Sequence, residues 1–211
     1  FDEQMNPIGT ALREDVHGRG LWHQTFQCWI TFEKNNKKYF LLQLRHKDKE
    51  SFPDKLDKAC AGHVDAGESV RDGGIREFEE ELGLYINPND LYFCGVVPLE
   101  HQSSAQFIDR EFCHIYLYRL GSHVSLPDLN LQADEISGIF YIEIDDFRQL
   151  VMQKKEDSGG RKSEVTISGW LLNEEEKLIP TQRTVTIHDF TTQSEDYHKL
   201  LFESLERMNM D

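Results

Sequence analysis

Four glutamates lie within the five consecutive positions from Glu77 to Glu81, in a segment with the periodicity of a helix. Like charges at helical spacing repel by a few tenths of a kcal/mol per pair. Glu77, Glu80 and Glu81 are three and four residues apart and therefore share one helix face. A charged run is commonly a solvated surface, but clustered carboxylates are also the oxygen ligands that Mg²⁺ prefers. The spacing thus raises the hypothesis of a cation site.

The helix that carries these carboxylates has recognisable ends and an apolar side. Ser69 is a suitable N-cap, and Gly83 stands where a helix should end, which predicts a helix from about 70 to 82. Phe78 and Leu82 lie away from the carboxylates at helical spacing and are expected to face the core. The acidic face is therefore expected to point into a site beside the loop that begins at Gly62.

The residues around this helix match the pattern G-x5-E-x7-R-E-U-x-E-E-x-G-U without a mismatch, where U is bulky and apolar. The matching residues are Gly62, Glu68, Arg76, Glu77, Phe78, Glu80, Glu81, Gly83 and Leu84. From average residue frequencies, a chance match in this chain is rarer than roughly one in a million. The pattern is the Nudix box, so residues 62–84 resemble those of a Nudix hydrolase.

The resemblance implies an α/β (α+β) fold, an α/β/α sandwich with a mixed sheet in which the box forms a loop, a helix and a loop. It implies Mg²⁺- or Mn²⁺-dependent hydrolysis of a small-molecule diphosphate, a nucleoside diphosphate linked to another group. By motif match, Glu80 and Glu81 are the main metal ligands, Glu77 is a further ligand or a base, and the Gly62 carbonyl is a possible ligand. The group beyond the diphosphate would be recognised by loops outside the box.

Three further residues take roles from the same resemblance. Glu68 and Arg76 would pair to fix the loop against the helix, a bidentate structural role that Lys would fill less well. Glu135 stands shortly before a predicted strand, where an acidic residue often completes the metal or base set in Nudix enzymes. Alternatively, Glu135 is one more exposed acid in an acidic chain.

A second resemblance extends over about residues 1 to 145, to type I isopentenyl-diphosphate isomerases and related Nudix hydrolases. In the isomerases, two early histidines, a histidine in a GH pair and two glutamates one residue apart bind a metal. The matching positions are His17, His23, His63 and Glu111, with Asp109 in place of the other glutamate. Each histidine could instead be a hydrogen-bonded structural residue, and Glu111 an outward-facing strand residue.

One position argues against the isomerase reaction. The isomerases use a Cys directly before the GH pair, where this chain has Ala61, with Cys60 one place earlier. On a strand, a shift of one residue turns the side chain to the opposite face. The isomerases also tend to have a degenerate box, whereas this box is complete. Hydrolysis is therefore favoured, with isomerisation and a non-catalytic binding or regulatory module as alternatives.

Composition limits the partners and the compartment. The chain has 38 acidic and 23 basic residues and a net charge of -15, which argues against binding to a nucleic acid polymer or a membrane surface. It contains no apolar run of about 18 residues that could span a membrane. None of its four cysteines forms a CxxC pair, which indicates reduced thiols and a cytoplasmic location.

Alternating segments rich in β-formers predict a sheet around the box. The expected strands are 23–33, 39–45, 91–98, 110–120 and 136–144, followed by a helix at 145–155. These elements would form a Nudix domain over residues 1–155. The segment 156–164 resembles a linker, and the strands 165–172 and 181–190 and a helix at 194–208 follow it. Residues 156–211 are thus expected to be an extension packed on the domain, as a lid or as the dimerisation element of a possible homodimer.

Overall fold

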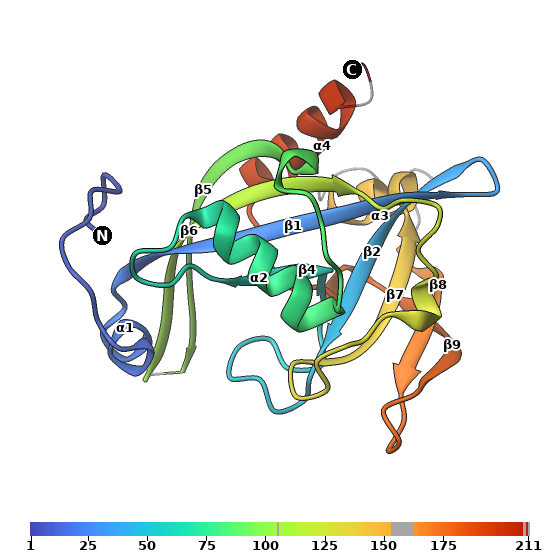
Figure 1. The fold of residues 1–211 in the computed structure, drawn as a ribbon, viewed down its shortest axis with the longest axis horizontal. Helices are drawn as coiled ribbons and strands as arrows, with labels where there is room; N and C mark the ends of the chain where they lie inside the picture. Colours follow the sequence, from blue (N-terminus) through green and yellow to red (C-terminus); the bar gives the residue numbers. More distant parts are fainter. Residues whose placement is uncertain (105, 153–162, 209, 211) are drawn as a thin grey trace.

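The computed structural model describes residues 1–104, 106–152, 163–208 and 210. A nine-stranded sheet forms its centre, in the order β5-β6-β1-β2-β7-β8-β9, with β3 paired to β2 and β4 paired to β1 (Figure 1). The strands are β1 (Trp22–Lys34), β2 (Lys37–Arg45), β3 (Leu56–Lys58), β4 (Cys60–His63), β5 (Tyr92–Ser104), β6 (Phe107–Arg119), β7 (Ile136–Glu143), β8 (Val165–Leu172) and β9 (Leu178–Val185). Strands β1 and β6 run parallel and the other pairs are antiparallel, so the sheet is mixed, as predicted.

Helices cover both faces of the sheet (Figure 1). Helix α2 (Val70–Leu82) packs against one face, where Phe78 and Leu82 join a buried cluster with Phe26 of β1. On the other face, α3 (Ile144–Val151) and α4 (Glu195–Met208) pack in a second cluster that contains Trp29 of β1. Successive side chains of a strand point to opposite faces, so β1 contributes to both clusters. The predicted α/β/α sandwich is confirmed.

The helix of the box begins and ends as predicted. The Ser69 hydroxyl accepts a hydrogen bond from the backbone N–H of Asp72 at 3.1 Å, and Gly83 adopts the left-handed conformation with φ 65°. The helix also packs tightly on β1, because a Cβ atom at Gly74 would lie 2.3 Å from the ring of Phe26. This close approach holds the acidic face of α2 at a fixed height over the sheet.

Some short elements were not predicted, and two of the predicted strands reach further than expected. Helix α1 (Arg13–Arg19) and β3 are short and depend on their neighbours, β3 through its pairing with β2. Strand β5 continues to Ser104, rather than ending at 98, and β6 begins at Phe107 rather than 110, because the two pair along their whole length. Both long strands contribute residues to the site described below.

Other boundaries also differ from the prediction. The predicted strand 181–190 ends at Val185, because Thr186 caps a 3-10 helix at Ile187–Asp189. The predicted helix 145–155 is α3, whose predicted residues 153–155 lie outside the described residues, as does most of the predicted linker 156–164.

The described residues of the C-terminal segment share the sheet and the core with the preceding residues. Strand β8 pairs with β7, and α4 places the fully buried side chains of Tyr197 and Leu201 in the cluster with Trp29. Between them, Thr191 donates its backbone N–H to the Leu56 carbonyl of β3 at 2.9 Å. The roles as lid or dimerisation element stay predictions. Among the described residues, none of the helices has the length and apolar character needed to cross a bilayer.

Candidate active site

Two groups of ionisable side chains line one cavity of about 530 Å³. The first, called the acidic cluster, consists of Glu77, Glu80, Glu81 and Glu135. The second, called the histidine–carboxylate cluster, consists of His17, His23, His63, Asp109 and Glu111, of which all except His23 line the cavity. The fold therefore brings together the residues that the two family resemblances single out.

In the acidic cluster, Glu81 is the most buried carboxylate, with 4% of its surface exposed. Its Oε2 accepts a hydrogen bond from the backbone N–H of Ala61 at 3.1 Å. Burial and the charge of Glu77 nevertheless raise the pKa of Glu81 to about 8. Burial also raises the pKa of Glu77, although Arg76 acts in the opposite direction. The charged forms of these carboxylates are thus disfavoured unless a cation binds to the cluster.

Glu77 lies directly against the backbone of Gly62, the first residue of the box. A Cβ atom at position 62 would stand 2.0 Å from Cδ of Glu77. The pairing of Phe26 on β1 with Gly62 on β4 fixes this backbone beneath the helix. A larger residue at position 62 would therefore displace the Glu77 carboxylate from its place against this backbone.

Arg76 contacts more partners than the predicted one. Its Nε lies 3.3 Å from Oε1 of Glu68, as the motif implies. Its Nη1 also donates to Glu77 at 2.8 Å and to Glu80 at 2.9 Å, and Nη2 donates to the His63 carbonyl at 3.1 Å. The guanidinium thus ties the loop of the box to the helix and partly offsets the charge of the acidic cluster.

Glu135 reaches the acidic cluster from the loop before β7. It forms an ion pair with Lys49 of the loop between β2 and β3. Its charge contributes to the raised pKa values of Glu77 and Glu81. The Gln132 backbone N–H donates to the Glu81 carbonyl at 3.1 Å, which holds this loop beside the C-terminal end of α2.

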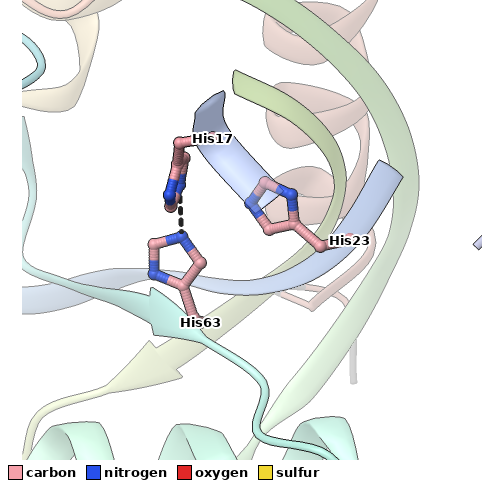
Figure 2. A group of neighbouring side chains, drawn as sticks. All are labelled: His17, His23 and His63. Atoms are coloured by element: carbon pink, nitrogen blue, oxygen red, sulfur yellow. Dashed lines mark hydrogen bonds between the residues drawn. The ribbon is translucent and has the colours of Figure 1, made fainter. Parts of the chain in front are cut away.

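The histidine–carboxylate cluster joins three histidines from different elements, namely α1, β1 and β4. Figure 2 shows His17 pointing at His63, with His23 beside them; Nε2 of His17 lies 3.1 Å from Nε2 of His63. Strand pairing sets the neighbours, because His23 on β1 lies opposite Glu111 on β6. The possible ligand atoms of the three histidines lie within 4.8 Å of one another, as do those of His23, Asp109 and Glu111.

Hydrogen bonds define the protonation of two of these rings. His17 donates Nδ1–H to the Arg13 carbonyl at 2.9 Å, and its Nε2 lies 3.2 Å from Asp109, whose hydrogen bond raises the pKa of His17. His23 donates Nδ1–H to the Leu21 carbonyl at 3.0 Å, and burial lowers its pKa. Its other nitrogen, Nε2, thus carries a lone pair and is buried without a hydrogen-bond partner in the described part of the chain.

Burial also lowers the pKa of His63, to about 2. His63 is therefore neutral, and a hydrogen bond between its Nε2 and Nε2 of His17 requires one of the two nitrogens to carry the proton. The position between Asp109 and His63 favours a positive charge, which protonation of His17 would supply, since Asp109 raises the pKa of His17. A metal ion would satisfy the same two neighbours and also the lone pair of His23.

Basic side chains that sequence patterns did not reveal line the same cavity. Lys58 is 4% exposed, and its Nζ lies 3.0 Å from Oδ1 of Asp57. Burial acts to raise the pKa of Asp57, but Lys58 and Arg45 hold it below its ordinary value. Arg45, Lys49 and Arg13 also line the cavity. No motif marked these residues; the one signal was the charged segment around them.

Ala61 and Cys60 lie on opposite sides of β4, as strand alternation predicts. Ala61 lines the cavity. Cys60 is fully buried on the other side with Cys28 and Phe78, where burial raises the pKa of its thiol well above the ordinary value. All four cysteines are free. The thiol that the isomerases use is therefore missing from this cavity.

Residues 22–164 match the sequence model of the NUDIX domain. The chain belongs to the Nudix family. An uncharacterised Nudix hydrolase of Clostridium acetobutylicum is 34% identical over 205 residues, which is 97% of this chain and 94% of that protein. Nudix hydrolase 3 of Arabidopsis thaliana is 34% identical over 147 residues, covering 69% of this chain and 18% of that protein.

Isomerases are among the relatives too. The isopentenyl-diphosphate Delta-isomerase of Cutibacterium acnes is 28% identical over 154 residues, 71% of this chain and 75% of that protein. A crystal structure of a MutT/nudix family protein from Enterococcus faecalis covers 99% of this chain and 67% of its own, with a TM-score of 0.53 and 13% identity, which shows the shared fold. This Nudix protein is a pyrophosphohydrolase, a member of a family that acts on pyrophosphate-containing substrates and generally uses divalent metal ions.

Proposed function

We propose that this enzyme uses Mg²⁺ or Mn²⁺ to hydrolyse the diphosphate linkage of a nucleoside diphosphate joined to another group. Buried Glu81 is the observation that carries the proposal, because burial and Glu77 raise its pKa to about 8. A buried carboxylate without a cation is costly. An all-oxygen donor set that is short of positive charge fits a hard divalent ion.

Glu80 and Glu81 would hold this metal, with Glu77 as a further ligand or base and the Gly62 carbonyl as a further oxygen donor. When bound, such an ion stabilises charge on phosphate oxygens and lowers the pKa of a water molecule. Glu68 and Arg76 fix the loop of the box through their contacts at 3.3 and 3.4 Å. Glu135 lines the same cavity in an ion pair with Lys49 and would assist there as a base.

The basic side chains of the cavity support an anionic substrate. The protein carries a net charge of -15, so a diphosphate needs a local attraction to enter. Arg13, Arg45, Lys49 and Lys58 line the cavity together with the acidic cluster. Phosphate oxygens would contact these cations on one part of the wall and the metal on another.

The histidine–carboxylate cluster supports a second metal centre. Nε2 of His23 is buried without a hydrogen-bond partner among the described residues, and Nε2 of His17 lies close to Nε2 of His63; a cation would stabilise both arrangements. Imidazole donors suit Zn²⁺ and carboxylate donors suit Mn²⁺, so the mixed set fits either ion. With Asp109 and Glu111, the centre would place a second positive charge at the cavity.

Isomerisation of isopentenyl diphosphate is the second candidate, and the histidine–carboxylate cluster is the feature that favours it. The residues next to the cluster oppose it: Ala61 lines the cavity, and Cys60 is buried on the far side of β4. A methyl group can neither donate nor accept a proton. We therefore assign hydrolysis rather than isomerisation.

The test is a substrate panel of nucleotide sugars, dinucleotides, nucleoside diphosphates and prenyl diphosphates, with Mg²⁺ or Mn²⁺. We expect metal-dependent release of phosphate-containing products from a nucleoside-diphosphate compound. Full turnover in an excess of chelator would exclude the proposed mechanism. Selective turnover of a prenyl diphosphate would exclude the proposed substrate class but leave the metal chemistry in place.

A further inference from the structure

A buried chain of hydrogen bonds links α4 to the histidine–carboxylate cluster. Trp29 donates Nε1–H to the hydroxyl oxygen of Tyr197 at 3.0 Å. The Tyr197 hydroxyl donates to Oε1 of Gln27 at 2.9 Å. Gln27 in turn donates from Nε2 to Oε2 of Glu111 at 3.3 Å. Trp29, Tyr197 and Gln27 are all at most 3% exposed, and the hydrogen-bond chain reaches the cavity at Gln27 and Glu111.

The direction of these hydrogen bonds follows from the chemistry of Trp29. An indole nitrogen can only donate, so Trp29 occupies an acceptor position on the Tyr197 oxygen. The hydroxyl proton of Tyr197 is then free to go to Gln27, which sets the amide with its oxygen toward Tyr197 and its NH₂ group toward Glu111. A flipped amide would place an oxygen against the carboxylate. Tyr197 therefore selects the amide orientation that Glu111 requires.

Glu111 is oriented through one of its oxygens. Besides Gln27, Oε2 of Glu111 accepts hydrogen bonds from the Thr25 hydroxyl at 3.1 Å and from the Cys113 thiol at 3.4 Å. Three donors on the same oxygen fix the plane of the carboxylate. Strand pairing sets this carboxylate beside His23, where the two could share a cation with Asp109.

We propose that Tyr197 is a positioning residue for the metal centre at the histidine–carboxylate cluster. It acts through Gln27, which orients Glu111. The proposal rests on the second metal centre put forward above. Tyr197 lies on α4, beyond residues 22–164 that match the NUDIX domain. A helix outside the matched domain would thus complete the site inside it.

Tyr197→Phe separates this role from simple core packing. The variant keeps the ring, which is fully buried in the cluster shared by α3 and α4, and removes only the hydroxyl. Gln27→Met keeps a chain of similar length and removes both polar ends of the amide. Leu201→Ala is the matched control, because it removes a fully buried group one turn along the same helix without touching the hydrogen-bond chain.

Co²⁺ is the probe, because its visible absorption bands report the number and geometry of its ligands. A band that wild type shows and His23→Asn loses identifies binding at the cluster. Tyr197→Phe and Gln27→Met are expected to raise the apparent Kd for Co²⁺ about 10- to 100-fold, as for other groups that orient metal ligands, and to shift the bands. Leu201→Ala is expected to lower the melting temperature and leave both the Kd and the bands unchanged.

The double variant sharpens the test. If both residues act through one chain, Tyr197→Phe adds little to the loss already caused by Gln27→Met. Additive losses, an unchanged Kd in Tyr197→Phe, or an equal loss in Leu201→Ala would each overturn the role of Tyr197 and leave the metal centre standing. If wild type shows no band that depends on His23, the metal centre and the positioning role both fail. Should Tyr197→Phe not fold, Gln27→Met compared with Leu201→Ala decides alone.

Discussion

Replacing Glu81 by Gln is expected to stabilise the metal-free protein at neutral and alkaline pH, although it removes a proposed metal ligand. Gln keeps the length of the side chain and an oxygen that can accept the Ala61 N–H, now bonded at 3.1 Å. It removes a charge that is 4% exposed and close to Glu77. The same change should therefore raise stability and abolish turnover.

The size of the effect follows from the pKa of Glu81, which burial and Glu77 raise from 4.5 to about 8. At 1.36 kcal/mol per pKa unit, this difference corresponds to about 5 kcal/mol at most. Because Glu81 lines an open cavity that water can enter, we expect roughly half of this, about 2–3 kcal/mol. The gain is in the free energy of unfolding of Glu81→Gln relative to wild type.

The sign and the pH window follow from linkage. The folded pKa lies above the unfolded one, so the unfolded state releases this proton first as the pH rises. The contribution of Glu81 to wild-type stability is therefore retained below about pH 4.5 and lost progressively up to about pH 8. Glu81→Gln has no such loss. The difference in the free energy of unfolding between Glu81→Gln and wild type should therefore increase across this window.

Urea denaturation in the presence of a chelator, at several pH values between about 5 and 8, measures this difference. Mg²⁺ should restore stability to wild type and have a smaller effect on Glu81→Gln. Glu79→Gln on the exposed side of α2 is the control, and it should show no comparable increase of the difference with pH. If Glu81→Gln is no more stable than wild type at the upper end of this window, the burial penalty that motivates the metal site is wrong.

Three further predictions concern activity. Glu80→Gln should lower the turnover rate about 10²-fold or more with the fold intact. A rate near that of wild type with an unchanged Mg²⁺ requirement, measured in the same assay, would show that the acidic cluster does not bind the catalytic metal. Arg76→Lys should lower the melting temperature and the activity together, because a single ammonium cannot reproduce the contacts with Glu68, Glu77 and Glu80. A loss of activity without a change in the melting temperature would indicate instead that Arg76 contacts the substrate. Isopentenyl diphosphate incubated with the protein and Mg²⁺ should yield no dimethylallyl diphosphate by NMR, since Ala61 lines the cavity where the isomerases have a thiol. Appearance of that product at enzymatic rates would contradict the assignment.

The sequence by itself determined the features that depend on local spacing. The acidic face of α2, its N-cap at Ser69 and its end at Gly83 follow from helical periodicity and backbone preference within one short segment. The opposite sides taken by Ala61 and Cys60 follow from strand alternation. Strands that depend on a partner strand were harder to predict from the sequence. Strand β3 forms because β2 pairs with it, and β5 extends to Ser104 because β6 runs beside it.

Tertiary structure decided the contacts between residues that are far apart in the sequence. The contact between His17 and His63 joins positions 46 apart in the chain, and that between Tyr197 and Gln27 joins positions 170 apart. Strand register fixes part of the histidine–carboxylate cluster. The pairing of β1 with β4 and β6 places His63 and Glu111 beside β1. The sequence marks Lys58 only by the charged segment around it and does not mark Tyr197, because their polar roles arise from burial next to Asp57 and Gln27. Burial depends on the packing of the whole chain, so it cannot be predicted from a short segment of the sequence.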